Sequence, residues 1–425
     1  MRSEQHSPSP KALPPSGLRC ATLCGEFLTQ DTSLQVRTVK PSSILIVAGE
    51  PSGDQLAAEL VRALRRKNGP LEPRFFGAGG PAMARAGVEI LCDLTTHSAI
   101  GPADALRQLG RFRRAFALLT RAARERTPDL VIGVDFGAFN LRLLKVVTTL
   151  AQERAGPFNN WTPRRVQFVS PQVWASRPGR ARQMPRILDR LLSILPFEKD
   201  WYAQNAPGVR VEFVGHPLVD RHGPPPGSRP RVPGERPHLV LLPGSRSAEL
   251  RRHWPVVAPA ARKVVEKTGA RCTLVLPHEA ALDVLKALPP GPAGPEGLTV
   301  QIGDLGRALA DADVAIASTG TVTLECAWFT VPTVALYKTS WSTYQIGRRI
   351  VSVRHLAMPN LLAGRTVMPE FIQGEATPEA LSAAALGFLE SPQAAAEARA
   401  ALTRVRRSLG PPGAAERAAE CLLAD

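Results

Sequence analysis

A short apolar run that stops at a glycine turn just before a helix constrains this chain most. Residues 238–249 read HLVLLPGSRSAE. We predict a buried strand over 239–242, a turn at Pro243-Gly244 and a helix whose N-cap is Ser245. Such a turn aims free backbone N–H groups beyond the sheet and favours an anion, and Arg246 adds a donor fork suited to phosphate. The alternative is an ordinary turn with a solvated arginine.

The same design recurs in residues 313–325, DVAIASTGTVTLE. A strand over 314–317 leads into a hydroxyl-rich turn made by Ser318, Thr319, Gly320 and Thr321. Glu325 lies in the helix that follows. Turns at the carboxyl ends of two strands of one α/β sheet can face a single ligand. Hydroxyls suit a diphosphate and a glutamate suits the two ribose hydroxyls, so the predicted ligand is a nucleoside diphosphate.

Strands alternate with helical lengths along most of the chain, which predicts an α/β fold with parallel sheets. Residues 221–237, RHGPPPGSRPRVPGERP, form a linker, because prolines block both ladder and helix hydrogen bonds. The linker separates an N-terminal domain over 42–220 from a C-terminal domain over 238–380. Residues 381–425 are predicted helices, and their packing back on the N-terminal domain is left open. Residues 1–41, rich in proline, serine and charge, are predicted to be disordered.

Polar residues also follow the predicted strands of the first domain. The first strand leads into AGEPSGD and then a predicted helix over 55–66. Glu50 and Ser52 of that turn suit a sugar or acceptor hydroxyl better than a pyrophosphate. A simple capped turn is the alternative there. Asp135 ends the strand DLVIGVD, at the sheet edge where catalytic groups collect. His216 lies in a further strand-end turn and is either a ligand contact or a structural histidine.

The net charge of +16 predicts an anionic partner. Nucleic acid is disfavoured, because aromatic residues make up only 5% of the chain and the arginines are not interleaved with them. Residues 99–125 carry an apolar stripe flanked by arginines, which predicts a helix either on an anionic membrane surface or packed on the core. A GC-rich genome would also produce an excess of arginine and alanine.

Four further patterns limit the function. No apolar run approaches the roughly 18 residues that a membrane span needs. The six cysteines show no paired framework, which is typical of a reducing cytoplasm. Asp311 and Asp313 resemble a metal-binding DxD but precede their strand, at the wrong end of the sheet for ligands, so no metal is predicted. The strand-and-GxGxxG pattern of dinucleotide-binding dehydrogenases is missing.

In this order, the motifs resemble those of the lipid-A-disaccharide synthases, bacterial inner-membrane-associated glycosyltransferases of the GT-B type. The similarity spans roughly residues 44–380. The matching segments are AGEPSGD (48–54), GAGGPAM (77–83), GVDFGAFN (133–140), SPQVWA (170–175), LPFE (195–198), FVGHPL (213–218), LLPGSRSAE (241–249), STGTVTLE (318–325) and PNLLAGR (359–365). The resemblance implies two Rossmann-like domains whose parallel sheets face a central cleft.

The resemblance also implies an inverting transfer of 2,3-diacylglucosamine from UDP-2,3-diacylglucosamine to 2,3-diacylglucosamine 1-phosphate. The products would be a β(1→6) disaccharide 1-phosphate and UDP, formed in lipid A biosynthesis. No cofactor and no metal are expected, because a helix N-terminus and basic groups stabilise the leaving diphosphate. The enzyme would lie in the cytoplasm, peripherally on the inner face of the inner membrane. A homodimer stays an open option for its assembly.

Matching positions carry the family's roles onto this chain. Asp135 is the expected general base toward the acceptor 6-hydroxyl, provided that the cleft raises its pKa toward neutrality, and Glu50 is the reserve candidate. The Gly244-Ser245-Arg246 turn and the Ser318–Thr321 turn are expected to hold the diphosphate, with Glu325 on the ribose. The residues expected to border the donor are Asn360 and Arg365.

The chain departs from the family pattern at two places. Phe136, Gly137 and Ala138 stand where Ala, Pro and Asp are usual, and Ser176 replaces a second tryptophan. The missing acid at Ala138 weakens any two-carboxylate mechanism. Two alternative functions therefore stay open. One is another UDP-sugar enzyme of this architecture, such as a UDP-N-acetylglucosamine 2-epimerase, and the other is a catalytically silent nucleotide-sugar-binding paralogue.

Overall fold

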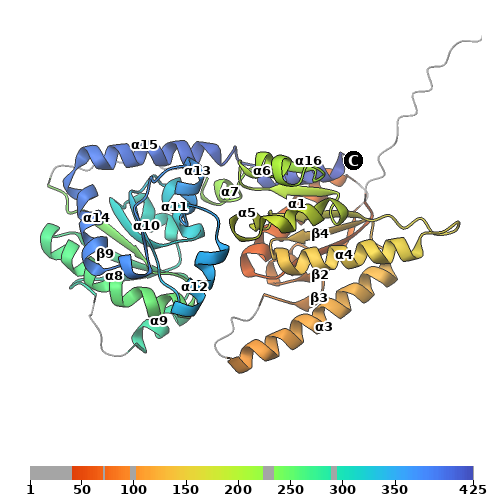
Figure 1. Cartoon of the computed structure of the whole chain (residues 1–425), viewed down its shortest axis with the longest axis horizontal. Coiled ribbons are helices and arrows are strands. Elements are labelled where there is room, and N and C mark those ends of the chain that lie inside the picture. The colour runs from red at the N-terminus through yellow and green to blue at the C-terminus, as the bar shows by residue number, and fades with distance from the viewer. Residues whose placement is uncertain (1–40, 70–71, 96–101, 224–233, 289–293, 425) are drawn as a thin grey trace, which may run out of the picture. The chain divides into compact units, whose positions relative to one another are not determined.

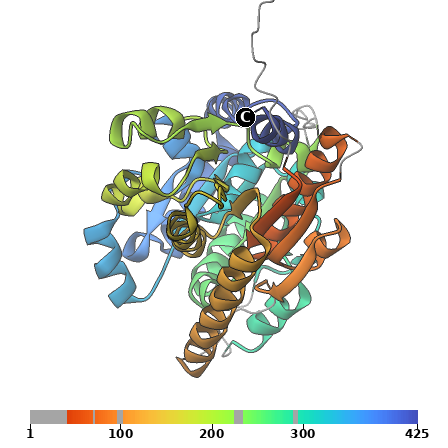
Figure 2. The same cartoon turned by 90° about the vertical axis from the view of Figure 1, so that its right-hand side faces the viewer.

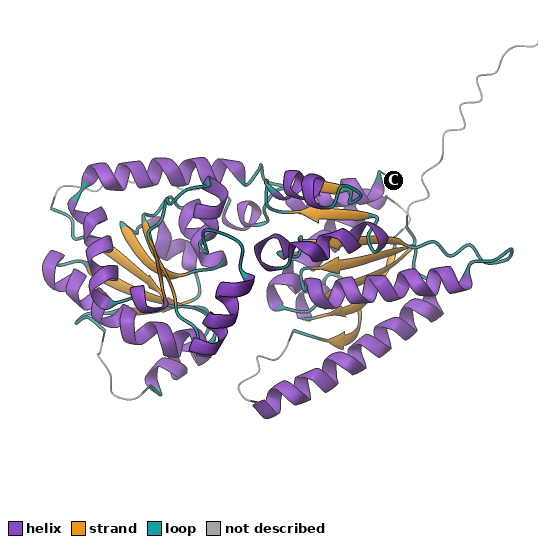
Figure 3. Ribbon diagram, in the orientation of Figure 1, coloured by secondary structure: helices purple, strands orange, loops and turns teal. Residues whose placement is uncertain are grey.

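The structure is a computed structural model. It describes residues 41–69, 72–95, 102–223, 234–288 and 294–424, with side chains described from residue 109 onward in the helix that begins at Pro102. The predicted disorder of the N-terminal segment therefore lies outside the described residues, as does most of the proline-rich linker. Figure 3 shows that sheets flanked by helices make up the described chain.

Seven parallel strands form the first sheet, in the order β3-β2-β1-β4-β5-β6-β7. Their bounds are β1 Ser43–Ala48, β2 Arg74–Gly79, β3 Glu89–Asp93, β4 Leu130–Val134, β5 Arg164–Phe168, β6 Arg190–Ser193 and β7 Val211–Phe213. Six parallel strands form the second sheet, in the order β10-β9-β8-β11-β12-β13. These are β8 His238–Leu242, β9 Arg271–Leu276, β10 Thr299–Ile302, β11 Val314–Ser318, β12 Thr333–Tyr337 and β13 Glu370–Ile372. The predicted α/β fold with two parallel sheets is confirmed.

Strand order reverses once in each sheet, and these reversals position the site. In the first sheet the chain runs outward from β1 to β3 and then returns to add β4 on the other side of β1. The second sheet does the same around β8 and β11. At such a switch point the connections leave in opposite directions, so a crevice opens beyond the carboxyl ends of the strands.

Helices cover both faces of each sheet (Figure 1). Those of the first domain are α1 Pro51–Asn68, α2 Pro81–Arg85, α3 Pro102–Arg126, α4 Gly137–Arg154, α5 Val173–Ser176, the 3₁₀ segment Pro178–Arg186, α6 Glu198–Asn205 and α7 Leu218–His222. After the linker come α8 Ser247–Thr268, α9 Glu279–Lys286, α10 Leu305–Ala310, α11 Thr321–Trp328, α12 Trp341–Ile350, α13 Met358–Ala363, the 3₁₀ turn Gln373–Glu375, α14 Pro378–Glu390, α15 Pro392–Ser408 and α16 Ala414–Leu423.

Alternation along the strands divides each domain into two cores. Ile44 and Ile46 of β1 pack with α1 and α16, whereas Leu45 and Val47 pack with α3 and α4 on the other face. Side chains of a strand point alternately to opposite faces, so a strand covered on both sides reads as a continuous apolar run. In the second sheet, the same alternation along β8 serves α11 and α15 on one face and α8 and α14 on the other.

Two helix starts differ from the sequence prediction. The N-cap of α8 is Arg246 rather than Ser245, because the Glu249 carboxylate accepts hydrogen bonds from the backbone N–H groups of both residues. The helix expected after the first strand begins at Pro51, four residues earlier than predicted at Gln55. Proline suits a first helical position, because its ring fixes φ and its missing N–H has no partner there anyway.

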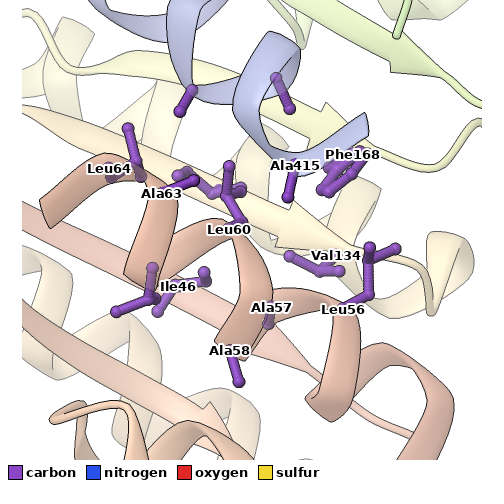
Figure 4. Packing of buried hydrophobic residues seen from close by; sticks show 14 of the residues in the cluster. Ile46, Leu56, Ala57, Ala58, Leu60, Ala63, Leu64, Val134, Phe168 and Ala415 are labelled. Carbon is purple, nitrogen blue, oxygen red and sulfur yellow. The ribbon is translucent and has the colours of Figure 1, made fainter. Parts of the chain in front are cut away.

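The C-terminal helices pack on different cores. In α15, Leu402 and Val405 join the core of the second domain. In α16, Ala415 and Leu422 join the core that contains α1, and Figure 4 shows Ala415 beside the side chains of that helix. Asp220 of α7 accepts hydrogen bonds from the first N–H groups of α16, including that of Gly413 at 2.5 Å.

This packing predicts that Leu422→Ala lowers the stability of the protein. Leu422 is 1% exposed, so its truncation leaves a cavity between α16 and α1. We expect a loss of about 2–5 kcal/mol, seen as a lower urea midpoint of unfolding. Leu118→Ala, the same truncation at a side chain that is 40% exposed, is the control and should change little. Equal effects of both substitutions would contradict the docking of α16.

Candidate active site

A pocket of about 440 Å³ lies beyond the carboxyl ends of β8 and β11. The two turns predicted to bind diphosphate both line it. Its lining includes Gly244, Ser245, Arg246, Ser318, Thr319, Gly320, Thr321 and Glu325. Folding therefore brings these predicted residues into one concave surface at the switch point of the second sheet.

Glycines allow both turns to bend sharply. Gly244 has φ 128° and Gly320 has φ 136°, a region that other residues rarely adopt. A Cβ at Gly244 would also lie 2.7 Å from the Glu249 carboxylate. Gly320 precedes α11 as its N-cap, and no side chain caps that helix start. The start of α11 therefore presents its backbone N–H groups to the pocket.

The turn before α8 is less open to an anion than the sequence predicts. Glu249 accepts the backbone N–H of Ser245 at 3.1 Å and forms an ion pair with the Arg246 guanidinium at 3.2 Å. The Arg246 side chain is still 73% exposed, so it can exchange this partner for a phosphate. A ligand diphosphate thus competes with Glu249 at the first turn, whereas the second turn has no internal carboxylate cap.

Glu325 is held by a histidine that sequence reasoning missed. The His222 Nε2 atom lies 3.2 Å from the Glu325 carboxylate, and the His222 ring packs edge-on against Phe329 at 5.2 Å. His222 ends α7, the helix just before the proline-rich linker. The two residues are 103 positions apart, so no local pattern signals the contact.

A second histidine that sequence reasoning missed, His253, supports the turn at Pro243 and Gly244 from inside the domain. His253 of α8 is fully buried, with Nδ1 2.6 Å from the Pro243 carbonyl and Nε2 accepting the Lys338 backbone N–H at 3.0 Å. Burial lowers the pKa of His253 and so favours the neutral ring that this pattern needs. His253 joins the end of β8 to the end of β12. Its place inside a helical pattern gives no sequence signal.

Asp135 lies at the carboxyl end of β4, beside the switch point of the first sheet. It and Phe136 both have positive φ, 50° and 42°, although neither is glycine. Side-chain amides of Asn140 and Gln167 hold this conformation by donating to the Asp135 carbonyl at 2.9 and 2.8 Å. Backbone strain that surrounding residues maintain is a common mark of functional sites.

Burial raises the pKa of the Asp135 carboxyl, and the negative charge of Glu50 raises it further. A hydrogen bond from the Phe136 backbone N–H acts in the opposite direction. The two carboxylates predicted as catalytic candidates therefore interact across the ends of β1 and β4. A raised pKa brings a carboxylate closer to the value at which it exchanges a proton efficiently near neutral pH.

The remaining predicted residues divide by exposure. Ser52 and Arg365 are exposed. His216 is 7% exposed, its Nδ1 accepts the Leu218 N–H, and burial lowers its pKa to about 4. Asn360 is fully buried, and its amide is used by backbone groups of its own loop and by Glu370. The Asn360 amide therefore holds its own loop together, and the expectation that Asn360 borders the donor stays a prediction.

One buried acid, Glu198, links two motifs of the first domain. Glu198 accepts hydrogen bonds from the Trp174 indole at 2.9 Å and the Ser193 hydroxyl at 2.7 Å, and burial raises its pKa. It thereby fixes the SPQVWA segment against LPFE. Beyond it, the Ser352 backbone N–H donates to the Ala175 carbonyl at 2.9 Å, which joins the chain after α12 to α5. Among the described residues, no cluster of His, Cys, Asp and Glu is arranged to hold a metal ion.

Two parallel α/β sheets, each with polar turns at its switch point, define the GT-B fold. Among solved structures, a calicheamicin glycosyltransferase superimposes with a TM-score of 0.56 at 16% identity, covering 91% of this chain and 99% of that one. A UDP-GlcNAc 2-epimerase from Methanocaldococcus jannaschii gives 0.52 at 13% identity, covering 90% and 99%. At such identities the likeness establishes the fold alone.

Sequence comparison identifies the family. The family model described as lipid-A-disaccharide synthetase matches residues 44–424. A lipid-A-disaccharide synthase of Anaeromyxobacter sp. (strain K) is 39% identical over 392 residues, covering 89% of this chain and 96% of that protein. The corresponding protein of Geobacter sulfurreducens is 36% identical over 386 residues, covering 89% and 96%. The chain belongs to the lipid-A-disaccharide synthase family and is a hexosyltransferase.

The geometry of the pocket predicts that Arg246→Ala weakens binding of a nucleoside diphosphate such as UDP. The variant removes one charge-assisted contact, which is typically worth about 1.5–3 kcal/mol, or about a 10- to 150-fold rise in Kd measured by calorimetry. Arg251→Ala is the matched control, because Arg251 is exposed on the same helix and does not line the pocket. An unchanged Kd for Arg246→Ala would remove Arg246 from the diphosphate site.

Proposed function

We propose that this chain joins UDP-2,3-diacylglucosamine to 2,3-diacylglucosamine 1-phosphate, giving the β(1→6)-linked disaccharide 1-phosphate and UDP. The acceptor 6-oxygen attacks the anomeric carbon of the donor from the face opposite the diphosphate. The bond from that carbon to the diphosphate breaks, and UDP leaves with the bonding electrons. The family match over residues 44–424 carries this proposal, and the pocket beyond β8 and β11 supports it.

The donor would lie with its diphosphate against the start of α11 and the Arg246 guanidinium. Negative charge grows on the diphosphate as the bond breaks, and donors that are already in place stabilise it without reorganisation. Glu325, oriented by His222, is suited to accept hydrogen bonds from the ribose hydroxyls. These roles use only side chains and backbone groups of the pocket.

The acceptor hydroxyl loses its proton during the attack, and Asp135 is the proposed base. Its partial burial and its strained, firmly held backbone favour a fixed carboxylate with a raised pKa. Ala138 supplies no second acid on the same turn. A single carboxylate is sufficient for an inverting displacement, because the attacking oxygen needs only one proton acceptor.

This mechanism predicts that Asp135→Asn lowers kcat by about 10²–10⁴-fold, while UDP affinity and the fold persist. An amide matches the carboxyl in shape but does not take up the proton. Turnover by the transferase, followed by mass spectrometry of the lipid product, measures the loss. Near-native turnover would eliminate Asp135 as the base.

Glu50→Gln supplies the companion measurement. The reaction needs Asp135 deprotonated, so activity falls as the pH drops through its raised pKa. Removing the Glu50 charge lowers that pKa, and the acid limb of the kcat/KM profile should move to lower pH. If Glu50 were the base instead, Glu50→Gln would abolish turnover at every pH.

We also propose that the enzyme works on the inner face of the inner membrane, because both of its proposed sugar substrates carry acyl chains. No helix within the described ranges is long and apolar enough to cross a membrane. The aromatic part of the apolar stripe predicted over 99–125 packs on the protein itself. Phe112 lies 5.6 Å from Phe136, and Phe116 lies 5.5 Å from Phe139, so both rings pack partly buried against the start of α4. The exposed side of α3 instead carries arginines, including Arg113 and Arg114.

If the exposed arginines of α3 contact an anionic membrane surface, Arg113→Gln combined with Arg114→Gln should weaken binding to anionic vesicles. Each arginine near such a surface contributes about 1 kcal/mol, so the double variant should bind about 30-fold more weakly in co-sedimentation. Added salt should reduce the difference. The matched control is Arg251→Gln with Arg252→Gln, two exposed arginines on α8. Equal losses in both double variants would place the membrane contact elsewhere.

A further inference from the structure

A second concave surface lies outside the donor pocket, between α3 and α4. These helices run side by side in both views (Figures 1 and 2). The groove between them has a volume of about 520 Å³. It is lined by Leu109, Phe112, Arg113, Phe116, Ala117, Phe136, Ala138, Phe139 and Arg142. Its floor is therefore aromatic, and the charged groups among its described lining residues are the guanidinium groups of Arg113 and Arg142.

We propose that this groove binds one acyl chain of the acceptor sugar. The inference rests on the proposed function, and it assigns an acyl subsite that the reaction alone does not locate. A long hydrocarbon chain gains about 0.8 kcal/mol for each CH₂ that leaves water. An open apolar groove beside the reacting atoms would supply that burial without drawing the whole lipid into the protein.

The position of Phe136 connects the groove to the chemistry. Phe136 directly follows Asp135, the proposed base, and its ring is stacked on Phe139 at 5.2 Å. It also lies against the turn before Glu50, since a Cβ added at Gly49 would be 2.3 Å from the ring. The groove therefore begins at the residue next to the base. The acyl groups on carbons 2 and 3 of the acceptor belong to the same sugar unit as the attacking 6-hydroxyl, so both lie close to the base.

Charge favours the acceptor over the donor as the occupant. The Arg142 guanidinium lies 5.3 Å from the centre of the Phe116 ring, and both Arg142 and Arg113 are exposed. They can meet the 1-phosphate of the acceptor, whereas the phosphates of the donor belong at the turns of the second domain. The acceptor combines acyl chains with a phosphate in one molecule, which matches an apolar groove with a cationic rim.

Ala138 gives the groove of this chain an uncharged wall that the family pattern does not have. The family pattern has an acid at that position, and here a methyl group lines the groove instead. A carboxylate there would have to be desolvated by a hydrocarbon chain, which is unfavourable. The alanine that removes a second acid from the turn thus leaves an uncharged wall for an acyl chain.

The test compares two neighbouring positions on α3. Ala117→Trp fills the groove from an exposed position, and Leu118→Trp adds similar bulk at a residue that does not line it. Each variant is assayed with acceptors whose acyl chains increase in length from short, water-soluble ones. For the native enzyme, kcat/KM should rise about fourfold per added CH₂ until the groove is full. Ala117→Trp should stop that rise at shorter chains and leave the shortest acceptors unaffected, while Leu118→Trp should follow the native profile.

Several outcomes would overturn the acyl subsite. One is a native length profile in Ala117→Trp, and another is an equal loss at every chain length. If Ala117→Trp keeps the native length profile and also binds vesicles more weakly, the groove holds bilayer lipid instead of the acceptor. Failure of the proposed function looks different, since the native enzyme would then turn over no acceptor of any length.

Discussion

The reversal of strand order beside β1 and beside β8 is the constraint on which the site depends. Parallel strands end at the same edge of a sheet, so their following turns gather there, and the reversal separates the outgoing connections. Asp135 and the turn containing Glu50 lie beside one reversal. Arg246 and the turn from Ser318 lie beside the other. Neither sheet needs a dedicated loop to build its half of the site, because the crossover topology already opens a crevice.

Rigidity at these edges comes from polar groups in the interior. The Asp54 carboxylate accepts three backbone N–H groups, one from Gly80 at 2.8 Å and two from the first turn of α2. The side-chain amides of Asn140 and Gln167 donate to the Asp135 carbonyl at the end of β4, and His253 contacts the Pro243 carbonyl at the end of β8. Buried polar atoms are stabilising only when they are paired, so each such contact fixes one geometry of its turn. The turns that carry the chemistry are thus specified from inside the domain.

Sequence reasoning located the strands and their turns because those signals are local. The apolar run before Gly244 and the hydroxyl run from Ser318 each fit within about a dozen residues, and parallel topology then places them together. It failed where the contact partner of a particular group decides the outcome. Glu249 captures the N–H of Ser245, and His222 meets Glu325 from across the linker. The motif that contains Asn360 does not show that this side chain lies buried inside its own loop. Phe112 and Phe116 do belong to the predicted apolar stripe, but periodicity alone does not predict that α4 packs against them.

The packing of α16 on the core of the first domain also affects how this chain folds during its synthesis. Residues 414–423 fill a place in the core beside α1, but the ribosome synthesises them after the entire second domain. At about 5–20 residues per second, on the order of ten to forty seconds separate the emergence of β7 from that of α16. During that interval the apolar side of α1 around Leu60 and Leu64 lacks its final cover. A nascent chain in this state would be a natural client for a ribosome-associated chaperone.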